Sequence, residues 1–195
     1  MLTLGGACTK AGGLTSLRSF TLAIHPDHPI ILAEAIELLL KKSRVEVFQS
    51  YMPSSDALAG QLCVRVVNQH RDHLVRLCFH PQSIPLATLE HVCISCPRLE
   101  DLFVAVHILY PAEMACFPFS FLVIHSHRDH QARFISILAK ATHLRTVYIY
   151  PVDLPHAWDP LEYALDIVRQ CSPTISPVGI ETGEWTLWRV GLLLY

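Results

Sequence analysis

The sequence carries little charge and no surplus of positive charge. Only 16% of its 195 residues are Asp, Glu, Lys or Arg, 51% are hydrophobic, and the formal net charge is −2. Because disordered chains are poor in apolar residues, this composition predicts an ordered protein. Without a basic surplus the chain has little with which to neutralise phosphates or an anionic lipid surface. We therefore expect neither nucleic acid nor membrane among its partners.

Long apolar runs and a disulfide framework are also absent from the sequence. The most apolar stretches, 29–40 and 117–124, fall short of the roughly 20 residues that a membrane-spanning helix needs. Residues 1–17 contain no continuous apolar segment of the kind found in a secretory signal. The seven cysteines are odd in number and lie in apolar stretches, which is typical of reduced, buried thiols. These features predict an intracellular protein of the cytoplasm or nucleus.

What the sequence does contain is a repeated pattern, apolar-x-x-apolar-x-apolar. Copies begin at residues 17, 45, 74, 99, 119, 144 and 175, at intervals of 20 to 31 residues. The copy at residue 45 is degraded, because Ser50 stands where the last apolar residue belongs. This period is that of a leucine-rich repeat, in which each unit supplies one short strand and one helix.

The intervals between the copies contain helical signals. Apolar residues recur at helical spacing in 29–42, 56–68, 85–95, 131–141 and 160–171. Two of these segments stop at Cys96-Pro97 and Cys171-Ser172-Pro173, because proline cannot continue a helix. No linker or charge block divides the chain. We therefore predict an α/β fold in one domain, residues 1–195: a leucine-rich-repeat-like solenoid of about six or seven irregular strand-helix repeats, with a parallel concave sheet and the helices outside.

Three segments carry a resemblance to a known family. They are 96–104 (CPRLEDLFV), 142–149 (THLRTVYI) and 166–173 (DIVRQCSP), and they resemble the divergent leucine-rich repeats of fungal F-box proteins. In that family an F-box docks on the adaptor of an SCF-type ubiquitin ligase, and the repeats select the substrate. No F-box motif precedes the first repeat, so we expect a repeat-only relative, or a fragment lacking an N-terminal F-box and a C-terminal cap. The resemblance implies a protein-recognition module whose partner is a protein ligand or substrate. The ligase adaptor would be a second partner only if an F-box lies outside this chain.

One row of side chains is expected to face away from the helices and to be free to bind a partner. In each copy of the pattern the third and fifth positions alternate with the inward apolar residues. The next outward position of each strand lies two residues after the fifth. From these positions we predict the following partner-binding residues on the concave face: Arg76, Asp101, Phe103, Phe121, His125, Tyr148 and Tyr150. Exposed aromatic and arginine side chains are typical of interaction hot spots. The alternative is that neighbouring loops cover the sheet, so that these aromatic residues belong to the core.

A histidine-rich run, His125-Ser126-His127-Arg128-Asp129-His130, points to a different function. It resembles the metal-binding motif of metallo-β-lactamase-fold hydrolases, where His125, His127, Asp129 and His130 would hold Zn²⁺ and activate a water. That family also has an upstream Asp-x-Gly strand and several downstream ligands, whereas this chain has no Asp-x-Gly and only His143 and His156 as later histidines. We therefore keep a zinc hydrolase as the alternative and expect a protein that is not an enzyme, with no catalytic residues, metal or cofactor.

Overall fold

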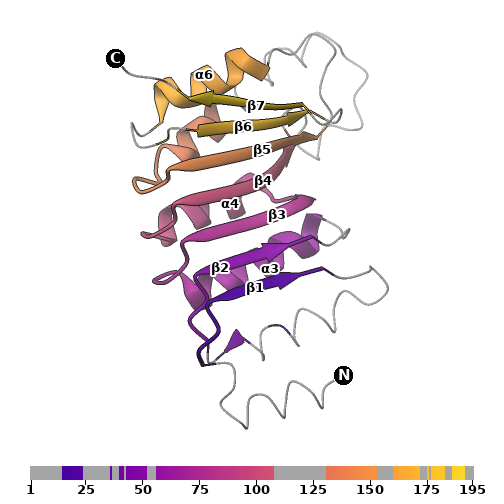
Figure 1. Ribbon diagram of the computed structural model, residues 1–195, viewed down its shortest axis with the longest axis vertical. Coiled ribbons are helices and arrows are strands. Elements are labelled where there is room, and N and C mark those ends of the chain that lie inside the picture. The colour runs from indigo at the N-terminus through magenta and orange to yellow at the C-terminus, as the bar shows by residue number, and fades with distance from the viewer. Residues whose placement is uncertain are drawn as a thin grey trace.

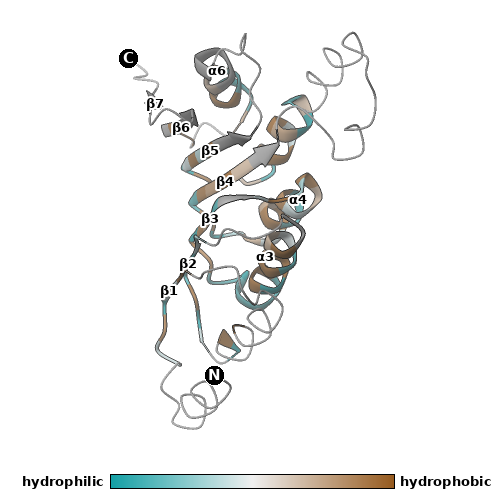
Figure 2. Cartoon of the chain, turned by 90° about the vertical axis from the view of Figure 1, so that its right-hand side faces the viewer, coloured by the Kyte–Doolittle hydropathy of each residue, from teal (hydrophilic) through white to brown (hydrophobic). Residues whose placement is uncertain are grey.

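The structure is built from two layers, a sheet and a row of helices. A computed structural model of the 195-residue chain describes residues 15–23, 36, 40–41, 43–51, 56–107, 131–152, 160–171, 175, 177–182 and 186–191. In Figures 1 and 2 the helices of this part of the chain all lie on one face of the sheet, and the opposite face carries no element. Within these residues no helix is long and apolar enough to cross a membrane.

Seven strands form one sheet, in the order in which they occur along the chain. They are β1 (Ser19–Leu22), β2 (Val47–Ser50), β3 (Arg76–Ser83), β4 (Asp101–His107), β5 (Thr146–Val152), β6 (Pro177–Thr182) and β7 (Thr186–Gly191). All pairings from β1 to β6 are parallel. Parallel neighbours need a crossover connection, and helices supply it: α3 (Asp56–His70), α4 (Leu86–Ser95), the helix at 131–138 and α6 (Pro160–Gln170). The predicted α/β class with a parallel sheet is confirmed.

The sheet differs from the prediction in the number of its units and in its last strand. The pattern at 119–124 predicts a strand between those that precede and follow it. Instead β4 pairs directly with β5 along its whole length, from Asp101 with Thr146 to His107 with Val152. The backbone edges of these two strands satisfy each other, which leaves no place for an inserted strand, and residues 108–130 lie outside the described part. The described residues form about five strand-helix units rather than six or seven, and β7 is antiparallel to β6.

The start of each unit is tied to the next unit by the same pair of backbone hydrogen bonds. The carbonyl oxygen before a strand accepts from two consecutive N–H groups of the following unit. The acceptors are Arg18 (from Glu46 and Val47, 2.7 and 3.0 Å), Glu46 (from Val75 and Arg76, 2.7 and 2.9 Å), Val75 (from Glu100 and Asp101, 2.8 and 3.1 Å) and Glu100 (from Arg145 and Thr146, 2.8 and 2.9 Å). Because the bonding is the same at each step, β1 to β5 begin in one register, and the register of β3 with β4 then shifts between Phe79 and Ser83.

The turns after the helices repeat in the same way. The backbone N–H of Ser43, His73, Leu99 and Leu144 donates to the carbonyl of the residue three positions earlier, which is Leu40, His70, Cys96 or Ala141. Each turn also carries a fully buried apolar side chain, namely Val45, Leu74, Leu99 or Leu144. Each turn therefore reverses the direction of the chain and also places an apolar side chain in the core.

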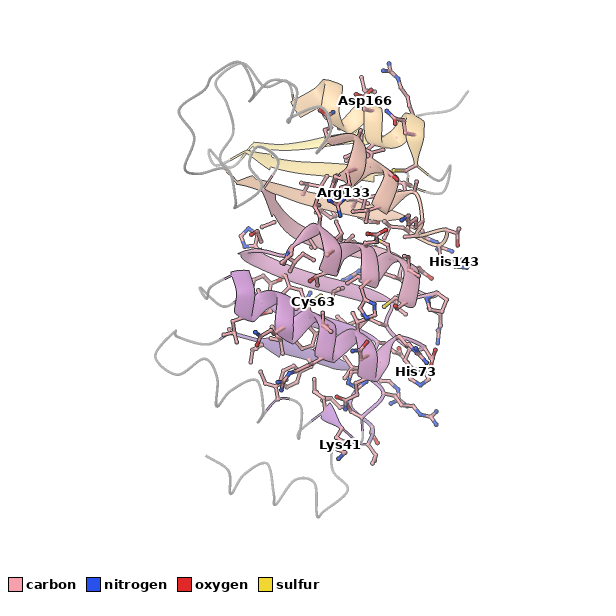
Figure 3. All side chains as sticks on the ribbon, turned by 180° about the vertical axis from the view of Figure 1, so that it is seen from behind. Lys41, Cys63, His73, Arg133, His143 and Asp166 are labelled. Carbon is pink, nitrogen blue, oxygen red and sulfur yellow. The ribbon has the colours of Figure 1, made fainter. Side chains whose placement is uncertain are left out.

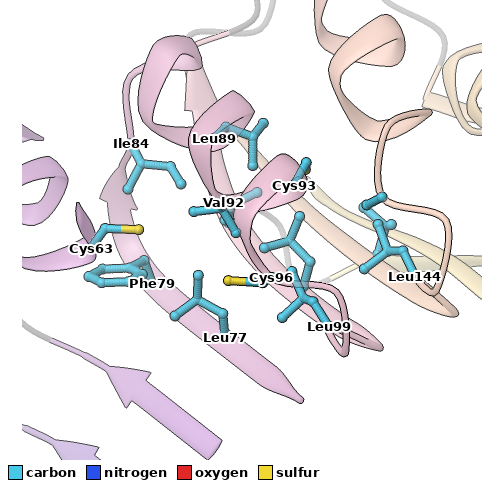
Figure 4. Packing of buried hydrophobic residues seen from close by; sticks show 14 of the residues in the cluster. Cys63, Leu77, Phe79, Ile84, Leu89, Val92, Cys93, Cys96, Leu99 and Leu144 are labelled. Carbon is cyan, nitrogen blue, oxygen red and sulfur yellow. The ribbon is translucent and has the colours of Figure 1, made fainter. Parts of the chain in front are cut away.

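The core lies between the sheet and the helices. Figure 4 shows Phe79 of β3 facing Cys63 of α3 and the α4 residues Leu89 and Val92, and all four belong to one buried cluster. Full burial of one such apolar side chain stabilises the fold by about 1.5–3 kcal/mol. The alternate residues of each strand that the sequence pattern marks as inward are therefore what holds the two layers together.

An aromatic ladder crosses the inner side of the first three strands. The ring centroids of Phe20 and Phe48 are 5.9 Å apart, and those of Phe48 and Phe79 are 5.7 Å apart. Ser50 interrupts the apolar surface beside this ladder, since it is fully buried and is the register partner of Phe79. Its Oγ has no hydrogen-bond partner within the described residues.

The cysteines of the described segments are free thiols and are buried. They are Cys63, Cys78, Cys93, Cys96 and Cys171. Burial raises the pKa of Cys93 and of Cys96 to about 12, and that of Cys171 to about 11. The Cys-x-x-Cys pair at Cys93 and Cys96 is thus part of the core.

Candidate functional site

The candidate site is the sheet face on which no helix of the described residues lies, and we call it the open face. Strand register places its side chains in rows that run across the strands. One row contains Ser19, Val47, Arg76, Asp101 and Thr146, and the next contains Thr21, Gln49, Cys78, Phe103 and Tyr148. Because neighbouring strands lie about 4.8 Å apart, five strands give each row a length of about 20 Å. The open face is therefore a continuous surface assembled from residues that are far apart in the sequence.

Two aromatic rings lie flat against each other in the second row. Phe103 of β4 is the register partner of Tyr148 of β5, and their ring centroids are 4.3 Å apart with the planes at 9°. Both side chains are half-buried. Neither ring belongs to the buried cluster between the sheet and the helices. Stacked rings on adjacent strands give a firm apolar surface, because an aromatic side chain has few torsions to order on binding.

An ion pair lies beside the aromatic stack and crosses from β3 to β4. Arg76 donates to Oδ2 of Asp101 from Nε (2.8 Å) and from Nη2 (2.6 Å). The side chains are 44% and 19% exposed, so water reaches the pair and its contribution to stability is about 0–1 kcal/mol. Its main effect is to orient the guanidinium, whose other N–H groups remain available to a partner.

Tyr51 covers the cysteine of the second row. The strand position of Cys78 faces outward, but only 4% of the residue is exposed, whereas Tyr51 is 44% exposed. A side-chain hydrogen bond joins the hydroxyl to the thiol. Burial raises the pKa of Cys78, although the bond to Tyr51 and the charge of Arg76 act in the opposite direction. The thiol therefore stays protonated near neutral pH, which argues against a nucleophile.

The polar end of the second row lies on β1 and β2. Thr21 Oγ1 donates to Gln49 Oε1 at 3.1 Å. From this end the row passes through Cys78 to the stack of Phe103 and Tyr148. The open face thus changes from polar to aromatic along its length, so it can orient a bound segment as well as hold it.

Four of the seven predicted partner-binding residues come together on the open face. Arg76, Asp101, Phe103 and Tyr148 are neighbours there. Tyr150 is the register partner of Ala105 on the same face, although its side chain lies outside the described part. Phe121 and His125 also lie outside it, and the place predicted for them, a strand between β4 and β5, does not exist.

Sequence reasoning missed Tyr51. It stands two residues after Gln49 and so keeps the outward alternation of β2. Ser50 stands in the last apolar position of this copy, so the repeated pattern ends before Tyr51. Strand alternation alone, continued by one more step, would have found it.

The histidine strings do not form a metal site in the described segments. Those segments contain no group of three or more His, Cys, Asp or Glu side chains placed to hold a metal ion. The run at 125–130 lies outside them. The similar string at 70–73 forms the end of α3 and its turn, with His70 buried and Asp72 paired with Arg71 at 3.9 Å.

Comparison with known proteins adds no relative. The chain matches no protein-family model, no curated protein and no solved structure.

Proposed function

We propose that this chain is a protein-recognition module with a leucine-rich-repeat-like solenoid, and that the open face binds its partner. The stack of Phe103 on Tyr148 beside the Arg76–Asp101 pair carries the proposal. Aromatic and arginine side chains that are already ordered are the residues that contribute most to protein interfaces. No described element covers them.

The regular stacking of the units supports the solenoid part of the proposal. Successive strands from β1 to β5 are joined by the same backbone bonds, and the turns that lead into β2 to β5 share one backbone hydrogen bond. In repeat proteins each unit contacts its neighbours, and the surface that results is extended and used for binding. The open face, at about 20 Å across five strands, has this character.

A partner segment would lie across the strands, along the rows. Strands β2 to β5 are paired on both sides, so their backbone N–H and C=O groups are already satisfied. An extra strand therefore cannot be added there. Recognition would instead use side chains, with the aromatic stack as the apolar anchor and Arg76 as the oriented polar group.

The resemblance to F-box proteins extends the proposal to substrate selection for an SCF-type ubiquitin ligase. In that role the protein bound to the open face would be the substrate, and the adaptor would bind elsewhere, to an F-box. Reduced, buried thiols fit the interior of the cell, where such a ligase acts. Co-purification of the adaptor with the protein expressed from its own gene tests this extension separately from the binding role.

Quantitative affinity capture with matched variants tests the binding role. We expect Phe103→Ala with Tyr148→Ala to lose, by about tenfold or more, partners that the intact chain retains. Ile94→Ala is the control, because Ile94 is a 62% exposed apolar residue on α4, away from the open face. Each variant is first checked by circular dichroism. Equal recovery of every partner by the double variant and by the control would refute the open face as the binding surface.

A further inference from the structure

A row of basic side chains follows the edge of the molecule where helices turn into strands. Directly before the buried residue of each turn stand Arg44, His73, Arg98 and His143, which we call the turn row. Three of them are exposed and His73 is half-buried. Figure 3 shows His73 and His143 on the same edge of the two layers. The repeat therefore places one basic or imidazole side chain at an equivalent point of four successive units.

The acidic residues of these turns do not neutralise the row. The turns contain the acids Glu46, Asp72 and Glu100, which pair respectively with Arg18 (3.5 Å), Arg71 (3.9 Å) and Arg145 (3.6 Å). Every acid thus already has an arginine partner. The side chains of Lys41, Arg44 and Arg98 have no hydrogen-bond or ion-pair partner within the described residues. Among the described residues, positive charge without an ion-pair partner therefore collects along this edge.

The turn row is basic, whereas the chain as a whole carries a small net negative charge. The sequence has 15 lysines and arginines and 17 acidic residues. The overall composition therefore does not predict a row of basic side chains without acidic partners among the described residues. Because Arg44 and Arg98 have no acidic partner among the described residues, the strip is complementary to an anionic occupant.

The spacing of the row sets the length of that occupant. Neighbouring strands lie about 4.8 Å apart, so the three steps from Arg44 to His143 span about 15 Å. An extended chain rises about 3.3 Å per residue, and a segment of about five residues would cover this distance. Carboxylates on such a segment can accept paired hydrogen bonds from the arginines.

We propose that the turn row binds an extended acidic segment of a partner protein. Glu or Asp side chains of that segment would contact Arg44 and Arg98 and lie beside the two histidines. A nucleic acid fits less well, because the chain is acidic overall and the strip offers few contacts to phosphates. The site is separate from the open face and does not depend on the function proposed for it.

Fluorescence anisotropy with a labelled hexaglutamate peptide tests the proposal on the full chain. We expect binding of hexaglutamate, none of hexaglutamine, and a Kd that rises with salt. Arg44→Gln with Arg98→Gln should weaken hexaglutamate binding by about tenfold or more. The matched control, Arg133→Gln with Arg169→Gln, removes the same charge from two exposed helix residues and should change the Kd by less than about twofold.

Several outcomes would overturn the proposal. They are no binding of hexaglutamate by the intact chain at millimolar concentration, equal loss in both double variants, and no loss in Arg44→Gln with Arg98→Gln. Tighter binding of an oligouridylate that depends on the same arginines would identify a nucleic-acid site instead. Phe103→Ala with Tyr148→Ala should leave hexaglutamate binding unchanged, so failure of this proposal is distinguishable from failure of the open face.

Discussion

His70 and Cys96 make the same backbone hydrogen bond in successive units: each lies where its helix ends, and its backbone carbonyl accepts the N–H of the residue three positions further on. Leu40 and Ala141 hold the equivalent place in two other units. An imidazole therefore fills a position that is otherwise apolar or a thiol. Both ring nitrogens of His70 are buried without a hydrogen-bond partner among the described residues.

We expect the protein to lose stability as the pH falls from about 6.5 to about 4. Burial, with a smaller effect of His73, lowers the pKa of His70 from 6.5 to about 4. In this range the unfolded chain takes up a proton that the folded chain does not, so the stabilising contribution is complete above pH 6.5 and is lost below it. The loss amounts to at most about 3 kcal/mol. Urea unfolding at pH 7.5, 6 and 5 measures it.

The substitution His70→Leu, which copies Leu40, should remove this part of the pH dependence. It should also raise stability at pH 7.5 by about 1–3 kcal/mol, because an unpaired buried polar group is replaced. His143→Leu is the control at an exposed histidine. An unchanged pH dependence in His70→Leu would show that other groups cause the acid instability.

Ser50→Val should stabilise the fold. Ser50 is fully buried at an inward position, next to Leu22 and Phe79 in register, and its hydroxyl has no partner among the described residues. Replacing it by an apolar residue of similar size should add about 1–2 kcal/mol to the free energy of unfolding. Ser19→Val, on the exposed side of β1, should change it by less than about 0.5 kcal/mol. A destabilised Ser50→Val would place a hydrogen-bond partner on Ser50.

The buried thiols should resist alkylation in the folded protein. Burial raises the pKa of Cys93 and Cys96 to about 12 and that of Cys171 to about 11, and the thiolate is the reactive form. Iodoacetamide at pH 8, followed by peptide mass spectrometry, should modify these cysteines at least about tenfold more slowly than in urea. Rapid modification of Cys93 in the folded protein would contradict its place in the core.

Much of the fold could be predicted because the repeat is local. The helix expected at 56–68 is α3, that at 85–95 is α4 and that at 160–171 is α6, each within a few residues. Apolar spacing determines such helices directly. The pattern at 119–124 failed as a strand of the sheet because apolar alternation does not specify a pairing partner, and β4 and β5 satisfy each other. The antiparallel β7 has no repeat signal at all.

The open face could be predicted only where strand alternation was intact. Arg76 and Asp101 fall on adjacent strands at the same register, so their pairing follows once the two copies are aligned. The stack of Phe103 on Tyr148 could not be predicted from the sequence. A segment of 38 residues, 108–145, separates β4 from β5, and the sequence pattern predicts another strand within it. The basic turn row could not be identified from the sequence either. Whether its arginines are free to bind an anion depends on which acidic residues pair with other arginines, and only the structure shows these pairs.

Metal analysis separates the binding module from the zinc hydrolase. We expect purified protein to contain no stoichiometric zinc, because the motif at 125–130 is not accompanied by the other ligands of that family in the sequence. Inductively coupled plasma mass spectrometry after gel filtration measures the metal content. One zinc per chain that disappears in His127→Ala with His130→Ala would instead establish a metal site. Zinc that survives this change would be bound elsewhere.

A double-mutant cycle should show that Phe103 and Tyr148 stabilise each other on the open face. Their rings are 4.3 Å apart and nearly parallel, and such pairs contribute about 0.5–1.5 kcal/mol beyond the area they bury. We expect urea unfolding of the two alanine variants and of the double variant to give a coupling of this size. Phe103→Ala with Thr21→Ala is the control, because these residues lie on β4 and β1 and should be additive within about 0.5 kcal/mol. Full additivity of Phe103 and Tyr148 would mean that the rings are not held together before a partner binds, and the partner would then have to order them itself.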